Sequence, residues 1–197
     1  MPERILMLHK PKGYEVTRPK TIESQSYPGQ KTVYSLLPPE FHAGRWMPVG
    51  RLDKDSTGLL LFVKEGALVR QLQKPHNLDK VYEVLVWGPL QSWHPEKMMA
   101  GVETPIGLLK AKKVEVLGES GPQALVRVVL GEGKNRHIRR MFAGLRDFKA
   151  NQHMNVLELK RTQMGPLNLD VESGTWRFLT ETETEGLLMC IPLKKKR

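Results

Sequence analysis

The hydrophobic positions of the chain fall into short runs separated by turn-forming residues. Residues 57–63 are a continuous apolar run, which predicts a strand covered on both faces. Residues 80–87 alternate between an apolar face that includes Tyr82 and a mixed face that includes Glu83, which also predicts a strand. Comparable patterns predict further strands at 5–8, 112–117, 124–130, 155–161 and 175–179.

Helical spacing and capping residues predict five short helices. Thr32 is placed to cap a helix at 33–37, and Thr180 is placed to begin one at 181–189, with Glu183 at the capping-box spacing. The remaining helices are predicted at 67–73, 95–100 and 136–145.

Residues 16–31 are polar and rich in Thr, Ser, Gln, Lys and Pro, which predicts a loop. Many strands, short turns and few helices favour an α+β fold with flanking helices and loops on a largely antiparallel mixed sheet. With no convincing linker, we expect a single domain over residues 1–197, in one or two lobes.

The charge balance adds a candidate partner. The 31 Lys and Arg residues outnumber the 21 Asp and Glu residues, which gives a net charge of +10. This surplus favours a polyanionic partner, with nucleic acid ahead of a membrane surface, although charge that serves only solubility is the alternative. The single cysteine, Cys190, fits a reducing compartment, and the apolar run at 5–8 is too short for a signal or a membrane span. We therefore expect a cytoplasmic protein.

The sequence lacks the motifs of metal-dependent, nucleotide-binding and serine-nucleophile enzymes. The six histidines include no pair at the three- or four-residue spacing of metal ligands, and there is no second cysteine. Residues 131–134 lack the first glycine of a phosphate loop, and no dinucleotide fingerprint or Gly-x-Ser-x-Gly turn is present. If the chain is an enzyme, we expect it to work with side chains alone and without a cofactor.

Three segments carry candidate chemistry. Residues 50–61 place an Arg-Leu-Asp in a polar loop before a buried strand, a common arrangement for catalytic groups. Residues 80–84 put a tyrosine on a strand. Residues 131–142 gather four Lys and Arg residues and a histidine within 134–140, alternating with apolar residues that we expect to anchor a helix in the core.

Together these segments resemble the RsuA type of pseudouridine synthase, a family that acts on ribosomal RNA. Gly-Arg-Leu-Asp at 50–53, with Asp-x-x-Thr-Gly-Leu after it, is similar to the segment that carries the family's catalytic aspartate. Lys-x-Tyr-x-Val at 80–84 matches the strand of its active-site tyrosine. Residues 132–141 match the segment of its active-site arginine. Lys10-Pro11 with Gly13 is similar to the family's opening motif. Its closing pattern is matched by Arg161 with Gly165-Pro166-Leu167 and by residues 174–179.

The chain departs from the family pattern in two ways. His137 stands where the family usually has Gln, which leaves the role of this residue open. The chain also starts at the opening motif, without the small helical RNA-binding domain that many members carry in front. The resemblance is therefore to the short, RluE-like branch.

The resemblance implies that Asp53 is the catalytic carboxylate that converts a uridine to pseudouridine. Arg139 matches the family's active-site arginine, and its guanidinium can grip a carboxylate with two hydrogen bonds. By the same resemblance, Tyr82 stacks on the uracil once the nucleotide has left the RNA stack, and Ile138 closes the apolar side of the pocket. Arg51 is expected to fill the vacated space or to bind the adjacent phosphate.

Basic residues outside this group are interpreted as RNA backbone contacts, which add salt-sensitive affinity with little sequence information. They are Lys134, Arg136, Arg140 and Lys10. For Lys10, a supporting structural role is the stronger interpretation.

Three alternatives stay open at the level of sequence. A non-catalytic RNA-binding or ribosome-assembly protein explains the charge equally well, but gives no reason for the intact Asp, Tyr and Arg set. A pseudouridine synthase acting on transfer RNA is the second. The third is a glycosidase that uses Asp53 and Asp55 as its carboxylate pair. We expect a monomer acting on ribosomal RNA, with the large-subunit RNA favoured.

Overall fold

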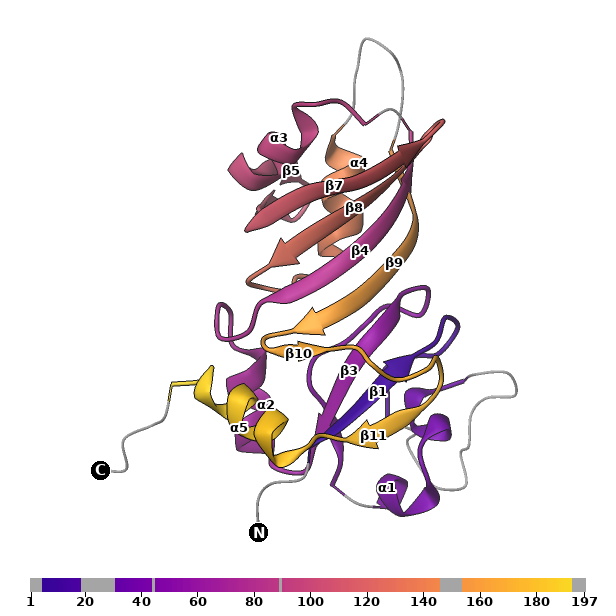
Figure 1. Ribbon diagram of the computed structural model, residues 1–197, viewed down its shortest axis with the longest axis vertical. Helices are drawn as coiled ribbons and strands as arrows, with labels where there is room; N and C mark the ends of the chain where they lie inside the picture. The colour runs from indigo at the N-terminus through magenta and orange to yellow at the C-terminus, as the bar shows by residue number, and fades with distance from the viewer. Residues whose placement is uncertain (1–4, 19–30, 44, 89, 146–153, 193–197) are drawn as a thin grey trace. The chain divides into compact units, whose positions relative to one another are not determined.

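A computed structural model describes residues 5–18, 31–43, 45–88, 90–145 and 154–192 (Figure 1). The chain divides into two compact units. Unit 1 comprises Met1–Leu78 and Arg161–Arg197, and unit 2 comprises Asp79–Lys160. The loop prediction for 16–31 falls mostly on residues outside the described ranges.

Unit 1 contains a sheet whose strands run in the order β11 (Trp176–Phe178), β1 (Leu6–Lys10), β3 (Thr57–Val63) and the last residues of β9 (Asn155–Met164). β1 is antiparallel to both β11 and β3. Two short strands extend the sheet, with β2 (Met47–Pro48) antiparallel to β3 and β10 (Leu167–Asn168) antiparallel to β9.

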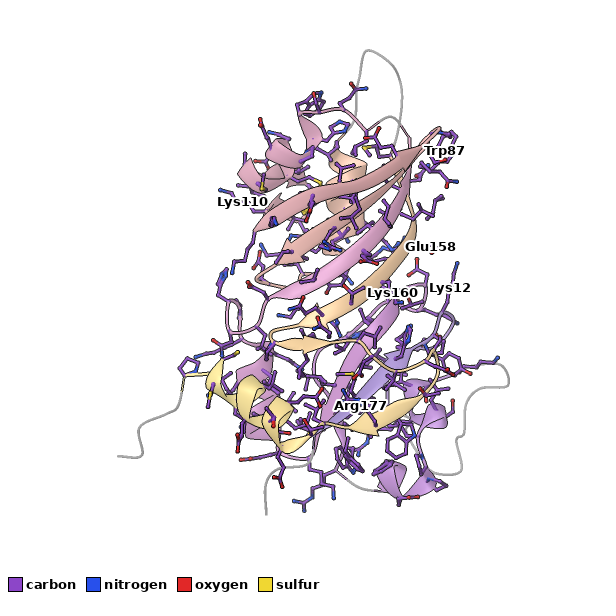
Figure 2. The ribbon with its side chains drawn as sticks, viewed as in Figure 1. Lys12, Trp87, Lys110, Glu158, Lys160 and Arg177 are labelled. Atoms are coloured by element: carbon purple, nitrogen blue, oxygen red, sulfur yellow. The ribbon has the colours of Figure 1, made fainter. Side chains whose placement is uncertain are left out.

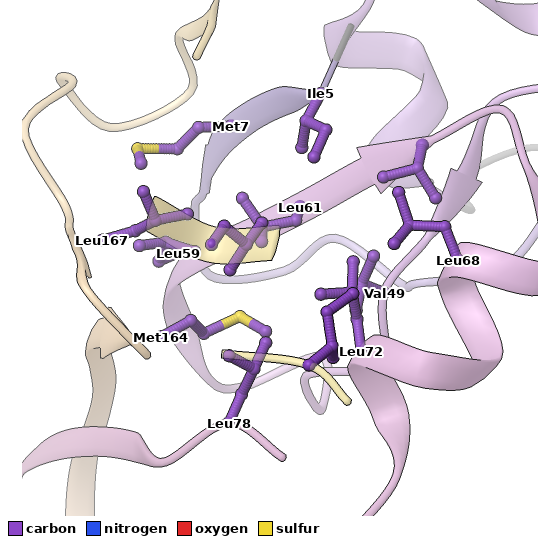
Figure 3. Close-up of a cluster of buried hydrophobic side chains, with 13 residues drawn as sticks. Ile5, Met7, Val49, Leu59, Leu61, Leu68, Leu72, Leu78, Met164 and Leu167 are labelled. Atoms are coloured by element: carbon purple, nitrogen blue, oxygen red, sulfur yellow. The ribbon is translucent and has the colours of Figure 1, made fainter. Parts of the chain in front are cut away.

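The central strand β3 is covered on both faces, as its unbroken apolar sequence predicted. One face carries Leu59, Leu61 and Val63, which pack in a cluster with α2 (Gly66–Gln73) and α5 (Glu181–Met189) (Figure 3). On the other face, the Phe62 ring meets the buried Tyr34 ring edge to face at 5.7 Å. Tyr34 belongs to the 3₁₀ helix η1 (Val33–Leu36), which is followed by α1 (Pro39–Ala43).

Unit 2 contains a sheet in the order β9, β4 (Lys80–Trp87), β8 (Gln123–Leu130) and β7 (Lys113–Ser120). β8 is antiparallel to both β4 and β7, and Tyr82 of β4 lies opposite Val128 of β8. The residues of the apolar face of β4 are buried and their neighbours in sequence are more exposed, as the alternation predicted. The unit also holds α3 (His94–Ala100), α4 (His137–Gly144) and a separate hairpin of β5 (Val102–Thr104) and β6 (Gly107–Leu109).

The α+β class and the mostly antiparallel sheet are confirmed, as are the longer strands and helices. Helix α5 begins at Thr180 with the predicted capping box, whereas Thr32 makes no side-chain cap at η1. The short elements α1, β2, β5, β6 and β10 were not predicted from the sequence. The single-domain expectation stays a prediction. In the described part of the chain, no helix has the length and apolar character needed to cross a membrane.

Candidate active site

Asp53 lies in unit 1, in the loop that leads into β3. The buried side chain of Leu52 anchors this loop in the core, while Asp53 is half-buried and Arg51 is exposed. A turn follows, closed by a 3.0 Å hydrogen bond from the Ser56 N–H to the Asp53 carbonyl oxygen. The fold therefore fixes the backbone at Asp53 and leaves its carboxylate at the edge of the buried region.

Lys10 stabilises the same loop through hydrogen bonds to its backbone. Its side chain has no exposed surface, and its ammonium donates to the carbonyl oxygens of Ser56 at 2.6 Å, Lys54 at 3.3 Å and Pro11 at 3.1 Å. Burial lowers the pKa of Lys10 to about 8, and the negative charges of Asp55 and Asp53 oppose that shift.

The burial of Lys10 bears on its two interpretations. Because the ammonium has no exposed surface, burial favours the supporting role over the RNA backbone contact, and both stay predictions. The supporting role is the one that its hydrogen bonds to the Asp53 loop describe.

Gly58 and Arg161 fix the exit of the Asp53 loop into β3. Gly58 has φ +111°, and a Cβ at this position would lie 2.2 Å from the Arg161 carbonyl oxygen. The buried Arg161 side chain donates from Nε to the Leu59 carbonyl oxygen at 2.7 Å. Only a glycine permits this close approach of the two strands. Both residues stand in family motifs, but the contact between them was not predicted from the sequence.

Tyr82 and the α4 residues lie in unit 2. Tyr82 is buried on β4, in the middle of the unit's sheet. Ile138, Met141 and Phe142 are buried, which confirms that apolar residues anchor α4 in the core.

The arginines of α4 are held in fixed positions. Arg139 donates from Nη1 to the Val156 carbonyl oxygen of β9 at 2.9 Å, and β9 is the sheet neighbour of the strand that carries Tyr82. Arg140 is bound to Asn135, with Nε 3.1 Å from the backbone carbonyl oxygen and Nη2 3.3 Å from the side-chain oxygen. Unit 2 therefore ties Arg139 to the strand next to the one that carries Tyr82.

The segment before α4 is exposed and basic. Lys134 forms a 3.1 Å ion pair with Glu132, and Arg136 takes a left-handed conformation with φ +50° at the start of the helix. His137 has only 4% of its surface exposed, and burial lowers its pKa. Its burial was not evident from a sequence in which it is flanked by arginine.

The described residues hold no group of three or more His, Cys, Asp or Glu side chains that could bind a metal ion together. The candidate residues named above offer a carboxylate, a phenol ring and guanidinium groups.

Comparison with known structures gives the class of protein to which this fold belongs. A crystal structure of a pseudouridylate synthase superposes with a TM-score of 0.76 at 26% sequence identity, covering 93% of this chain and 73% of that one. The fold is thus that of a pseudouridylate synthase.

Sequence comparison gives the family. The model of the RNA pseudouridylate synthase family matches residues 4–144, and the chain belongs to this family. It is 36% identical over 187 residues to a protein of Aquifex aeolicus named an uncharacterized RNA pseudouridine synthase, covering 92% of this chain and 70% of that protein. It is also 31% identical over 197 residues to the ribosomal large subunit pseudouridine synthase B of Vibrio vulnificus. That match covers 98% of this chain but only 57% of the relative, so the chain spans little more than half the length of that protein.

Proposed function

We propose that this chain isomerises a uridine of ribosomal RNA to pseudouridine, with large-subunit RNA as the substrate. The observation that carries the proposal is that 98% of the chain matches a relative named for large-subunit pseudouridine synthesis. The matched length contains the aspartate, tyrosine and arginine of the three motifs. A protein that only bound RNA would have no need for this set.

The isomerisation balances without a cofactor. The C1′–N1 bond of uridine breaks and a C1′–C5 bond forms, while C5 loses a proton and N1 gains one. Nothing is oxidised and no group is imported. We propose Asp53 as the essential carboxylate of this reaction, supported by its motif and by its position in a loop that Lys10 fixes.

The nucleotide must leave the RNA stack before the base can turn, which costs a few kcal/mol. We propose that Tyr82 offsets part of this cost by stacking on the uracil and that Ile138 supplies apolar contact. Arg139 is the proposed guanidinium partner that keeps the catalytic carboxylate ionised. Arg51, exposed beside Asp53, is proposed to occupy the vacated space or to bind the next phosphate.

Lys134, Arg136 and Arg140 are proposed to contact the RNA backbone. The ion pair of Lys134 with Glu132 is exposed, so it contributes little and can exchange for a phosphate. The same proposal includes a single catalytic domain, a monomer in the cytoplasm and no bound cofactor.

Pseudouridine mapping tests the proposed function. Ribosomal and transfer RNA from cells with and without the gene are compared by chemical mapping, and the purified protein is then tested on naked large- and small-subunit RNA. The expected result is one large-subunit site that disappears with the gene and is restored in vitro. A missing site in transfer RNA, or no missing site at all, contradicts the proposal.

A pair of variants distinguishes the proposed active-site arginine, Arg139, from the proposed RNA backbone contact, Arg136. Arg139→Ala is expected to abolish or severely reduce turnover while most RNA affinity is kept. Arg136→Ala is expected to weaken binding and to reduce the slope of log K against log salt by about 0.7 to 0.9. Near-normal turnover of Arg139→Ala, or an unchanged slope for Arg136→Ala, removes that residue from its role.

A further inference from the structure

The segment that follows β1 in unit 1 carries exposed basic residues that the proposed function does not use. The Gly13 N–H donates to the Lys54 carbonyl oxygen at 2.7 Å, which joins this segment to the residue next to Asp53. The Glu15 N–H donates to the Lys31 carbonyl oxygen at 2.9 Å, which brings Lys31 to the same place. Residues distant in sequence are thus gathered against the loop of Asp53.

The lysines of this segment point outward. Lys12 and Lys31 are exposed, and Figure 2 shows Lys12 extending away from the turn after β1. Lys12 has no ion-pair partner within the described part of the chain. The Lys31 ammonium lies 5.7 Å from the centre of the Tyr14 ring, a cation–π contact that does not neutralise its charge.

Lys54 has an acid partner, but a weakly bound one. Its ammonium lies 3.2 Å from Glu15, with 56% of the Lys54 side chain and 33% of the Glu15 side chain exposed. Exposed pairs of this kind contribute roughly 0 to 1 kcal/mol, so a phosphate can replace the carboxylate at small cost. The backbone of Lys54, in contrast, is held by Gly13 and Lys10.

We propose that Lys12, Lys31 and Lys54 form a second RNA-binding surface, which grips phosphates of the strand flanking the nucleotide at Asp53. This inference rests on the proposed function. It follows from chain continuity, because an RNA strand with one nucleotide at Asp53 must carry its neighbouring phosphates past the residues that adjoin that loop. Lysine suits the role because its ammonium binds phosphate as a point charge and does not read the base.

The surface is tested by RNA binding with a charge-matched control. The full chain is titrated with transcribed large-subunit ribosomal RNA over a range of salt concentrations. The first variant combines Lys12→Gln, Lys31→Gln and Lys54→Gln, which spares the backbone hydrogen bond of Lys54. The control combines Lys64→Gln, Arg70→Gln and Lys74→Gln, exposed positions in the segment that follows the far end of β3, a strand about 20 Å long.

If the three lysines contact phosphates, the first variant should bind RNA on the order of 10-fold more weakly than wild type. The slope of log K against log salt should fall by about 2, since each of three contacts to a single strand contributes about 0.7. The control, with the same net charge, should bind close to wild type. Equal losses in both variants overturn the inference, because they would report net charge alone.

A charge-retaining variant guards against misfolding. Lys12→Arg, Lys31→Arg and Lys54→Arg together should bind like wild type, and weakened binding in this variant also overturns the inference. Failure of the proposed function would give a different result from failure of this inference. In that case the unmodified chain forms no pseudouridine in ribosomal RNA, whatever its affinity for RNA.

Discussion

Lys10 is the residue whose surroundings most constrain the Asp53 loop. Its ammonium is the donor to three carbonyl oxygens and is buried, so folding transfers a charge out of water to stabilise a loop. A hydrocarbon side chain of similar length avoids that transfer but leaves the carbonyl groups without their donor. The balance between these effects decides the stability of the loop.

Lys10→Met is therefore expected to lower the free energy of unfolding at neutral pH by about 1 to 3 kcal/mol, the cost of leaving buried acceptors unsatisfied. Urea unfolding measures this loss of stability.

The pH dependence of stability provides a second test of Lys10. The folded pKa of Lys10, about 8, lies below its ordinary value of 10.5, so the unfolded chain binds more protons between these pH values. Wild type should gain stability relative to Lys10→Met as pH rises from about 8 to 10.5. Parallel pH profiles for the two proteins would show that the ammonium is not buried.

Gly58 is the other residue on which the loop depends. Gly58→Ala would place a methyl group 2.2 Å from the Arg161 carbonyl oxygen at a φ of +111°. Because backbone on both sides must move, we expect a loss of about 3 kcal/mol or more in the free energy of unfolding. Gly118→Ala is the matched control, since nothing lies within 4 Å of its Cβ and it should change stability by less than about 1 kcal/mol. Similar losses in the two variants, measured by thermal unfolding, contradict the close approach.

Among the elements, α4 carries an unusual first residue. His137 is buried, and burial lowers its pKa below the ordinary value of 6.5. The unfolded chain therefore takes up a proton at a higher pH than the folded chain, and stability falls as pH drops below about 6.5. The negative charge of Glu132 and a hydrogen bond with the Lys110 backbone oppose this shift, while the nearby Lys134 adds to it.

His137→Gln removes the titrating group and installs the residue usual in the family. Between pH 7 and 5 the wild type should lose stability relative to this variant, and above pH 7 the difference between them should be constant. Unfolding midpoints across this range provide the measurement. A difference that does not change with pH would mean that His137 is not buried in its neutral form.

The longer elements could be predicted because their signals are local. β3 has an unbroken apolar sequence since both of its faces are covered, and α5 has its cap and capping-box residues within four positions. The short elements α1, β2, β5, β6 and β10 are two to five residues long, too short for a periodic pattern to develop. Their existence depends on partners elsewhere in the chain.

At the scale of the whole molecule, the sequence left one or two lobes open but did not show where two compact units divide. The division passes between Lys160 and Arg161, inside the continuous strand β9, where no change of composition marks it. Unit 1 is built from both ends of the chain, so its core joins Ile5 and Leu61 to Leu167 and Leu187. Such long-range assembly leaves no local signature.

The candidate site was predictable only in part. Asp53, Tyr82 and Arg139 were recognised because family motifs surround them, and their roles stay proposals. A supporting role was expected for Lys10, but the contacts through which Lys10 and Arg161 support the Asp53 loop were not predictable, because the partners lie far apart in sequence. Lys10 binds a carbonyl 46 residues away, and Arg161 binds one 102 residues away.

The central claim is that the Asp53 carboxylate is required to form pseudouridine in ribosomal RNA. The most direct measurement incubates purified wild type and Asp53→Asn with transcribed large-subunit RNA in excess of enzyme, followed by pseudouridine quantification and RNA-binding titrations. Wild type is predicted to form pseudouridine at one site, while Asp53→Asn binds the RNA with similar affinity and forms none. Pseudouridine formed by Asp53→Asn at a rate near that of wild type would contradict the account.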